Sequence, residues 1–369
     1  MGHGNFGDEA MALALRLYLK RRLNHTRLSY YDVGEIPLFQ QPDDLAFDAL
    51  HRVATPRKIK QLLDRLYLDR FGTILLGGGG ILHSENSISW KLKIIDRLKR
   101  RHPTRPTGAV SMTLGPFKTD GARKLCQKLL QRLDFFHCRD QPSAALAQSL
   151  NPQLEIFSSF DISLTLPTLC PEKWPASHTK SEAGPVGLFL FKHAAREGIS
   201  SQNPLEKKQL RLVNEILARG RKVQLFTIYL GQGCLDASLN HFLKAQSADP
   251  EGVSIHTFDG DIFRTIQAMQ RCEAVVSMRY HGAVFAHLLG IPYLSLAYTP
   301  KNSWFIRTMG YPEEMDLAFH NPDAPFEPVL AGIEGLFQQG KQLYDHTVPL
   351  ERAMAATRED MERVMERLA

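Results

Sequence analysis

An arginine and a histidine stand two residues apart in the stretch VVSMRYHGAVFAHLLGIP, residues 275–292. Arg279 and His281 follow a strand-like apolar run, and Gly282 lies at the start of a helix-like stretch. In a parallel sheet, such a strand-to-helix turn lies at the edge where ligands bind. A guanidinium binds phosphate or carboxylate through two parallel hydrogen bonds, and a bound anion favours the protonated form of a nearby imidazole. The pattern predicts an anion site with a general acid, although a lone histidine can also be purely structural.

A second stretch that could bind a ligand is GHGNFGDEA, residues 2–10. Its glycines permit close approach to the backbone around Asn5 and Gly7. Asp8 is predicted as the N-cap of the following helix, with Glu9 in the first turn. The start of that helix offers unpaired N–H groups to an anion or a sugar hydroxyl, so the stretch is a candidate binding loop. A capped tight turn without a ligand explains the same residues.

The run LLGGGG, residues 75–80, places four glycines directly after a strand-like segment. Glycine in regular structure costs about 0.5–1 kcal/mol relative to alanine, so something must lie close to the backbone of Gly78, Gly79 and Gly80. The spacing matches neither G-x-G-x-x-G nor the phosphate-binding P-loop. A dinucleotide or ATP fingerprint is therefore excluded, and a bound ligand or close helix–strand packing accounts for the run.

Further charged residues follow other predicted strands. Arg139 and Asp140 come at the end of the strand-like DFFHC, where they could contact a ligand or form an ion pair that caps the next helix. Lys301 is expected in the loop after a strand that ends at Tyr298, and Lys192 ends the strand-like GLFLFK. Either lysine could hold a second negative group, although most lysines are simply solvated.

The composition is that of a soluble globular protein: 369 residues, 43% of them hydrophobic and 23% charged, with a formal net charge of +6. Five widely spaced cysteines without a C-x-x-C pair argue against a disulfide framework or a zinc site. Basic clusters at 20–22 and 99–101 end predicted helices, so nucleic-acid binding is not expected. Because no signal core or membrane span is found, we expect a cytoplasmic protein, with peripheral association at the inner face of a membrane left open.

Short apolar runs alternate with helix-period segments in both halves of the chain, which predicts an α/β protein with parallel, doubly wound sheets. A segment rich in Pro, Ser, Thr and Lys separates the halves and predicts a linker. We therefore expect two Rossmann-like domains facing a cleft. The predicted bounds are 1–166 for the first domain, 167–185 for the linker, 186–345 for the second domain and 346–369 for a C-terminal helix that can pack back on the first domain.

The beginning of the first half is irregular. A doubly wound half usually opens on a strand, whereas the glycine loop here begins at residue 2, so the first strand is missing, truncated or wrongly assigned. After the first predicted helix, a strand is predicted at 27–33 and a helix at 57–71.

Taken together, these stretches resemble the polysaccharide pyruvyl transferase family. The resemblance covers the chain up to about residue 305, with the motifs in family order and spacing. The matching motifs are GNFGDEA at 4–10, LLGGGG at 75–80, SMTLGPF at 111–117, CRDQPS at 138–143 and SMRYHGAVFAHLLGIPYLSLAYTPK at 277–301.

The resemblance implies a two-domain fold of the GT-B type. It also implies transfer of the enolpyruvyl unit of phosphoenolpyruvate to a sugar, which forms a pyruvate ketal and releases phosphate. Arg279 and His281 match the family positions with donor-binding and general-acid roles. Gly282, Lys301 and Lys192 complete the candidate donor site.

The acceptor, a nucleotide- or lipid-linked sugar, is expected in the first domain. Asp8, Glu9 or Asp140 would accept the hydroxyl protons, and we expect neither a metal nor a cofactor beyond phosphoenolpyruvate as co-substrate. The candidate acceptor residues are Asn5, Gly7, Asp8, Glu9, Gly78, Gly79, Gly80, Arg139 and Asp140.

Two other functions remain open at this point. A GT-B glycosyltransferase that uses a nucleotide sugar would share the architecture and would bind UDP or GDP tightly. A non-catalytic sugar-binding protein would bind without releasing phosphate. The sequence does not specify the acceptor sugar, the stereochemistry of the ketal or the oligomeric state.

Overall fold

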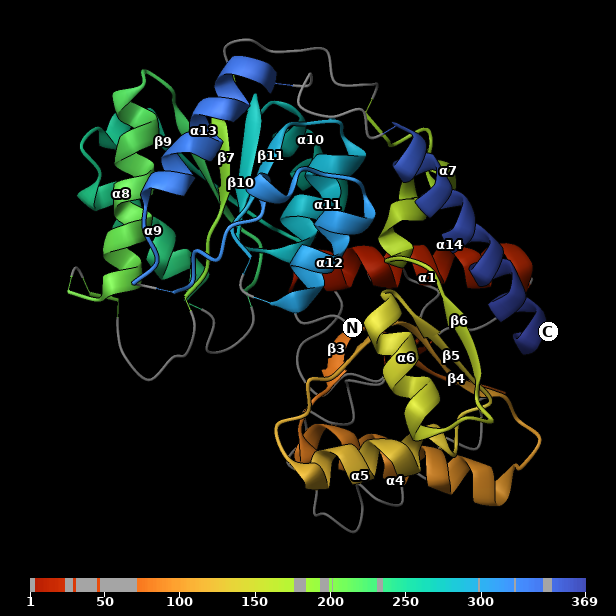
Figure 1. Cartoon of the computed structure of the whole chain (residues 1–369). Helices are drawn as coiled ribbons and strands as arrows, with labels where there is room; N and C mark the ends of the chain where they lie inside the picture. Colours follow the sequence, from red (N-terminus) through yellow and green to blue (C-terminus); the bar gives the residue numbers. More distant parts are fainter. Residues whose placement is uncertain are drawn as a thin grey trace. The chain divides into compact units, whose positions relative to one another are not determined.

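The chain forms two compact α/β units in a computed structural model (Figure 1). The first comprises Asp8–Leu169 and Ala353–Ala369, and the second comprises residues 4–7 and Cys170–Arg352. The structure describes residues 4–23, 29–30, 45–46, 72–175, 184–192, 199–200, 202–230, 235–297, 299–321, 323–340 and 347–369. The helix predicted at 57–71 lies outside these residues, and of the strand predicted at 27–33 only β1 (Ser29–Tyr30) is described, paired in parallel with β2 (Leu45–Ala46).

The first unit is built on a four-stranded parallel sheet whose strands follow one another in chain order. Helices α4 and α5 pack against each other (Figure 1), and α6 packs on three of the strands. The elements are β3 (Ile74–Leu82), α4 (Glu85–Arg101), β4 (Thr107–Leu114), α5 (Asp120–Leu130), β5 (Phe135–Cys138), α6 (Gln141–Leu150) and β6 (Glu155–Ser158).

Each of these three helices begins at a polar side chain that accepts a hydrogen bond from the backbone. Ser84, Thr119 and Asp140 cap α4, α5 and α6 respectively. Such caps satisfy donors that the first helical turn leaves free, and each contributes about 1 kcal/mol. The buried side chains of α4 and α5 recur at helical spacing, so each helix turns one apolar face to the sheet and the other face to solvent.

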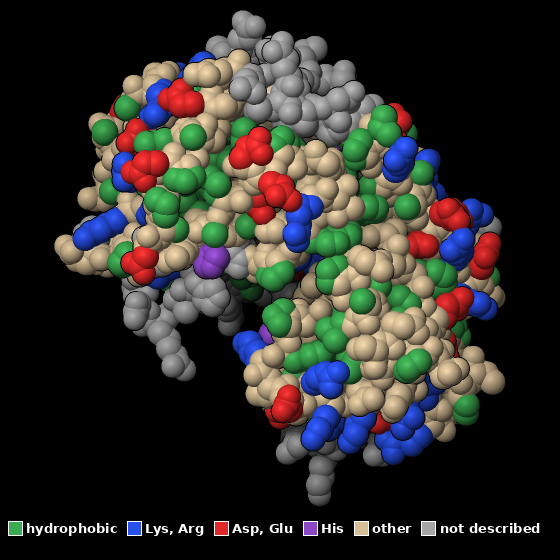
Figure 2. All heavy atoms as spheres, viewed as in Figure 1, with side chains coloured by type: hydrophobic (Ala, Val, Ile, Leu, Met, Phe, Trp, Pro, Cys, Tyr) green, Lys and Arg blue, Asp and Glu red, His purple; other side chains and the backbone are tan. Residues whose placement is uncertain are grey.

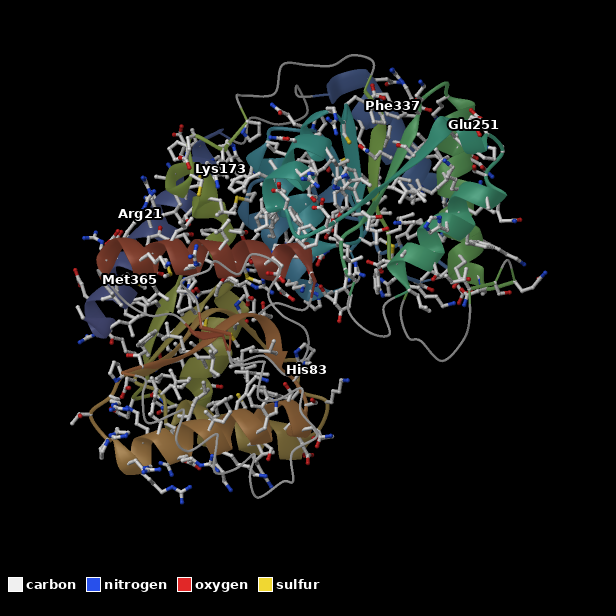
Figure 3. All side chains as sticks on the ribbon, turned by 180° about the vertical axis from the view of Figure 1, so that it is seen from behind. Arg21, His83, Lys173, Glu251, Phe337 and Met365 are labelled. Atoms are coloured by element: carbon white, nitrogen blue, oxygen red, sulfur yellow. The ribbon has the colours of Figure 1, made fainter. Side chains whose placement is uncertain are left out.

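The C-terminal helix belongs to the first unit from Ala353 onward. Arg367 forms an ion pair with Glu155 of β6 at 2.7 Å, and Arg22 of α1 pairs with Glu362. Figure 3 labels Arg21 on α1 and Met365 on the C-terminal helix. The remaining elements of this unit are α1 (Phe6–Arg22), the 3-10 turn η1 (Ile162–Thr165), α7 (Leu166–Leu169) and α14 (Thr347–Leu368), with α1 and α14 each extending across the unit boundary.

The second unit has a five-stranded parallel sheet in the order β11-β10-β7-β8-β9. Chain order reverses between β7 and β10, which makes the gap between their carboxyl ends the topological switch point of a Rossmann-like sheet. The strands are β7 (Val186–Phe189), β8 (Val223–Thr227), β9 (Val253–Thr257), β10 (Ala274–Ser277) and β11 (Tyr293–Ser295). The helices are α8 (Pro204–Ala218), α9 (Asp236–Gln246), α10 (Ile262–Gln270), α11 (Tyr280–Leu288), α12 (Pro300–Thr308) and α13 (Glu327–Gln339), with 3-10 turns η2 (Pro250–Gly252) and η3 (Glu313–Met315).

Residues 4–7 correct the predicted domain bounds, because they belong to the second unit and not to the first. Asn5 forms an antiparallel bridge with Tyr229, and the backbone N–H of Phe6 donates to Ile228 at 2.9 Å. The Phe6 ring packs against Phe258 and Phe285, with ring centroids 5.7 Å and 4.7 Å away. These contacts seat the segment beside the end of β8. In the described part of the chain, no helix is long and apolar enough to cross a bilayer.

Candidate functional site

The turn after β10 holds the arginine and the histidine that the sequence singled out. Ser277 fixes this turn, because its hydroxyl accepts from the Arg279 N–H at 3.1 Å and donates to the Arg279 carbonyl at 2.7 Å. Arg279 is the N-cap residue of α11, with φ −88° and ψ 131°. A side chain on Gly282 would place its Cβ 2.2 Å from Ser277 Oγ and 2.9 Å from Phe189 Cγ. Gly282 therefore lets α11 begin directly against β10 and β7, at the switch point.

The Arg279 guanidinium is held from two sides. Its Nη2 donates to both carboxylate oxygens of Asp236, at 2.6 Å and 2.5 Å, and its central carbon lies 4.8 Å from the centre of the Phe191 ring. The Asp236 side chain is 1% exposed, whereas 17% of the Arg279 side chain remains exposed. Nε of Arg279 is buried and has no hydrogen-bond partner among the described residues. These contacts orient the guanidinium, while part of the Arg279 side chain stays exposed.

Sequence reasoning missed Asp236 and Phe191. Asp236 is the first residue of α9, a helix that the sequence analysis did not predict. The segment DASLNHFLKAQ did carry a signal: an acidic residue at its start and Leu239 and Leu243 four residues apart. This spacing places both leucines on one face, where both are fully buried.

Gly7 leaves room for the imidazole of His281. A Cβ built on Gly7 would lie 1.8 Å from His281 Nδ1, closer than atoms can approach. The Asn5 side chain accepts from the Gly7 N–H at 3.1 Å, so Asn5, and not Asp8, caps the start of α1. The prediction that Asp8 is the N-cap was wrong by three residues, because the helix begins at Phe6. Gly7, predicted to contact the acceptor, thus forms the wall against which His281 lies, and Asn5 holds the Gly7 backbone in place.

His281 and Lys301 meet around Tyr280. The His281 ring packs edge-to-face on Tyr280 at 5.1 Å, and Lys301 Nζ lies 5.3 Å from the centre of the same ring. His281 is 7% exposed. Lys301 was expected in a loop, but β11 ends at Ser295 and Lys301 lies in the first turn of α12. The predicted strand end, Tyr298, lies outside the described residues. Arg279, His281 and Lys301 are therefore gathered at one end of the second sheet.

Lys192 lies beyond the end of β7, on the other side of the switch point. It forms an ion pair with Glu206 of α8, and the two side chains are 5% and 2% exposed. Glu206 also accepts from the Ser200 N–H at 2.6 Å. The charge of Lys192 is thus matched by a buried carboxylate, which leaves it less suited to a donor anion than Lys301.

The glycine run of the first unit has a conformational reason. Gly78 and Gly79 have φ values of 51° and 88°, in the left-handed region that favours glycine. On the neighbouring strand Ser111 also has a positive φ, 57°, so β3 and β4 distort together at this level. A Cβ on Gly79 would lie 3.3 Å from Oδ1 of Asp8. The Asp8 carboxylate is therefore what lies close to this backbone, while a Cβ on Gly80 would meet open space.

The carboxyl end of β3 is marked by His83 (Figure 3), whose Nδ1 lies 2.9 Å from the Gly80 carbonyl oxygen. Lys91 of α4 reaches the same strand end, and its Nζ donates to the Ser87 carbonyl at 2.8 Å and to the Ile81 carbonyl at 3.4 Å. Burial lowers the pKa of Lys91 to about 8. These contacts hold the strand end beside Gly80 in place.

Arg139 and Asp140 serve the framework of the first unit. Arg139 donates to Asp161 at 2.7 Å and to the Thr113 hydroxyl at 2.8 Å, and both charged side chains are sealed in the interior. Asp140 caps α6 by accepting from the Ser143 N–H at 2.8 Å, and it accepts from Thr113 at 3.1 Å. Glu9, in the first turn of α1, is fully buried. Among the acidic candidates for a general base, Asp8 alone is neither a cap nor fully buried.

His137 was not anticipated. Its Nδ1 accepts from the Ser111 N–H at 3.0 Å, and its Nε2 lies 2.8 Å from Ser159 Oγ. Complete burial lowers the pKa of His137 to about 4, although Asp161 opposes the shift. The ring is therefore a neutral brace that holds Ser111 in its unusual conformation. In the described part of the chain, no group of His, Cys, Asp and Glu side chains is placed to hold a metal ion.

The model of the family described as polysaccharide pyruvyl transferase matches residues 5–300 of the chain. No curated protein sequence matches it. Among solved structures, the chain is similar to the S. aureus MnaA–UDP co-structure, with a TM-score of 0.62, 11% identity and coverage of 99% of this chain and 95% of that chain. It is also similar to UDP-GlcNAc 2-epimerase from Neisseria meningitidis bound to UDP-GlcNAc, with a TM-score of 0.60, 12% identity and coverage of 98% and 97%. At such identities the likeness shows the fold, and it confirms the predicted GT-B-like pair of Rossmann-like domains.

Proposed function

The chain belongs to the polysaccharide pyruvyl transferase family, and on that premise we propose that it transfers the enolpyruvyl unit of phosphoenolpyruvate to a sugar of a glycan precursor. The observation that carries the proposal is the pairing of Arg279 and His281 at the switch point of the second unit. Arg279 is oriented by Asp236 and Phe191, and 17% of its side chain remains exposed. A preformed donor of this kind suits an anion that must be held in one orientation.

Phosphoenolpyruvate carries a carboxylate and a phosphate, so it needs more than one cation. We assign Arg279 and Lys301 to these two groups, since both lie around Tyr280 and α11. His281 packs on the same Tyr280 ring as Lys301, and its Nδ1 lies against Gly7. That wall limits rotation of the ring, which is what a proton donor aimed at one carbon atom requires.

The proposed reaction begins with transfer of a proton from His281 to the methylene carbon of phosphoenolpyruvate. The carbon that carries the phosphate then becomes cationic in character, and an acceptor hydroxyl adds to it while losing its proton to a base. Phosphate leaves with its bonding electrons, and a second hydroxyl of the same sugar adds at that carbon and closes the ketal. One of the two hydroxyl protons restores His281, and the base passes the other to the released phosphate.

We assign the base role to Asp8. Asp140 is committed to capping α6, and Glu9 is fully buried. Asp8 follows Gly7, the residue in contact with His281, and its carboxylate lies against Gly79. The open space beside Gly80 supports an acceptor in the same region of the first unit. The acceptor is proposed as a nucleotide- or lipid-linked sugar in the cytoplasm.

The direct test is incubation of the purified chain with phosphoenolpyruvate and a panel of nucleotide- and lipid-linked sugars. We expect release of inorganic phosphate together with a product heavier by one pyruvyl unit, in equal amounts. A glycosyltransferase would instead release UDP or GDP from a nucleotide sugar and would be protected from thermal unfolding by that nucleotide. Binding of a sugar with no phosphate release under any combination would leave the sugar-binding alternative.

A further inference from the structure

The positive charge of the chain is concentrated in one segment. Residues 85–134 contain twelve Lys and Arg and four Asp and Glu, which gives this segment a formal charge of +8. The whole chain carries 45 basic and 39 acidic residues, a net +6, so the other residues together carry 33 basic and 35 acidic residues, a net −2. The basic character of the protein therefore belongs to α4, α5 and their connections.

Most of these cations are exposed. Eight of the twelve have exposed side chains, and we call this set the basic face: Lys93, Arg100, Arg101, Lys118, Arg123, Lys124, Lys128 and Arg132. Arg132 pairs with Asp96 at 2.6 Å. Within the described part of the chain, Lys93, Lys124 and Lys128 form no ion pair, so their charges are not neutralised by neighbouring carboxylates.

Helix polarity explains only part of this charge. Arg100 and Arg101 lie in the last turn of α4, where the helix dipole favours cations. Lys93 lies in the middle of that helix, and Arg123 lies in the first turns of α5, where the dipole disfavours a cation. The helix dipole therefore accounts for Arg100, Arg101 and Lys128, which lie in last turns, but not for Lys93 or Arg123.

Packing turns these side chains toward solvent together. The apolar faces of α4 and α5, which include Ile95 and Leu98 in α4 and Leu129 in α5, are buried in the core of the first unit. Figure 2 shows Lys and Arg side chains gathered over these two helices, with few acidic side chains among them. A surface hollow of about 300 Å³ lies on the same face, lined by Asp96, Lys99, Arg100 and Arg132.

We propose that the basic face docks the protein on an anionic phospholipid surface, a role that goes beyond the proposed reaction and does not depend on it. The cations are spread along α4, α5 and the segments that flank α5, and half of the eight are lysines, which act as point charges. Such an array matches the diffuse negative potential of a bilayer that contains anionic lipids. The exposed residues between Arg123 and Arg132, apart from the cations, are Gln127 on α5 and its C-cap Gln131, and no exposed aromatic ring lies in the array to stack on a nucleobase.

The test is sedimentation of the full-length chain with vesicles. One set of vesicles contains phosphatidylcholine with about 30% phosphatidylglycerol, which gives the surface a negative potential. The other set contains phosphatidylcholine alone. We expect binding to the anionic vesicles only, and a loss of binding as salt is raised, because added salt shortens the Debye length. The triple variant Lys93→Gln/Lys124→Gln/Lys128→Gln should bind about 100-fold more weakly, since each cation contributes roughly fivefold.

A matched control removes three exposed cations from the second unit, in the variant Lys207→Gln/Lys222→Gln/Arg271→Gln. It has the same net charge as the first variant and should keep most of the binding. Equal losses in the two variants, or no preference for anionic vesicles, would overturn the proposal. Tighter binding to duplex DNA than to the vesicles at the same salt would assign the face to nucleic acid instead. Phosphate release with a soluble acceptor tests the proposed reaction separately, and neither triple variant should change it.

Discussion

Each unit places an arginine within two residues of the end of a strand and pairs it with a buried aspartate, but the two arginines differ in how much of the side chain is exposed. Arg139, after β5, is 2% exposed and donates to Asp161 and Thr113 within the core. Arg279, after β10, is 17% exposed, stacks on Phe191 and keeps Nε without a hydrogen-bond partner among the described residues. The same residue pair is thus sealed in the core of one unit and leaves the arginine partly exposed in the other. The exposed fraction of the arginine, and not the residue type, separates the two pairs.

The largest expected effect is on the proton donor beside Arg279. His281→Asn keeps a polar side chain of similar shape but removes the group that would transfer a proton. Turnover at saturating phosphoenolpyruvate should fall about 10²–10⁴-fold, the usual contribution of a general acid. The measurement is the rate of phosphate release, with His241→Asn as control because His241 is an exposed histidine of α9 in the same unit. Unchanged turnover in the His281 variant would remove its role as an acid.

Replacing the arginine of each ion pair with lysine tests whether the two pairs have different roles. Lysine keeps the charge that neutralises the aspartate but lacks the planar fork of arginine. Arg279→Lys should lower kcat/KM by roughly 10- to 100-fold, the worth of a charge-assisted hydrogen bond, with little change in the melting temperature. Arg139→Lys should lower the free energy of unfolding by about 1–3 kcal/mol, because it leaves Thr113 and Asp161 poorly satisfied, and should leave the activity per folded molecule intact. If both variants lost only stability, the two pairs would have one role.

The contact between Gly7 and His281 predicts a smaller effect. In a helix, Gly→Ala usually stabilises by up to about 1 kcal/mol. Gly7→Ala should do the opposite, because the new Cβ would lie 1.8 Å from Nδ1 and must displace the imidazole. We expect about a tenfold loss of turnover, since a misplaced catalytic group is costly. Gly72→Ala is the control, because a Cβ there meets nothing within 4 Å. A fully active Gly7 variant would show that the position of the ring is not set by this wall.

The sequence predicted the fold well because apolar periodicity and strand-to-helix turns are local signals. It also located Arg279, His281 and Lys301, which follow strands and therefore share one sheet edge. It could not show that Asp236 would reach Arg279, since that contact joins residues 43 apart in the chain. The sequence led to the assignment of Gly7 to the acceptor site, because a glycine indicates that some group lies close to the backbone but does not identify the group. Here that partner is His281, a residue far along the chain.

The smallest expected effect comes from His137, the buried histidine of the first unit, and it appears in the pH dependence of the free energy of unfolding. Burial lowers the pKa of His137 to about 4 in the folded protein, against about 6.5 when the chain is unfolded. Between these values the unfolded state binds more protons, so this contribution to stability is present above pH 6.5 and is lost as the pH falls toward 4. From pH 6.5 to 5.5, His137 should cost roughly 1 kcal/mol of unfolding free energy.

The variant His137→Gln isolates this contribution, because glutamine can accept from the Ser111 N–H and donate to Ser159 without titrating. Denaturant unfolding at pH 6.5 and 5.5 should show a smaller difference for the variant than for the parent chain. The pKa of His256 is also lowered by burial, so part of the pH dependence should persist. An identical pH dependence in both chains would mean that His137 is not held neutral in the folded state. The description of His137 as a neutral structural histidine, in contrast to His281 at the sheet edge of the second unit, would then be wrong.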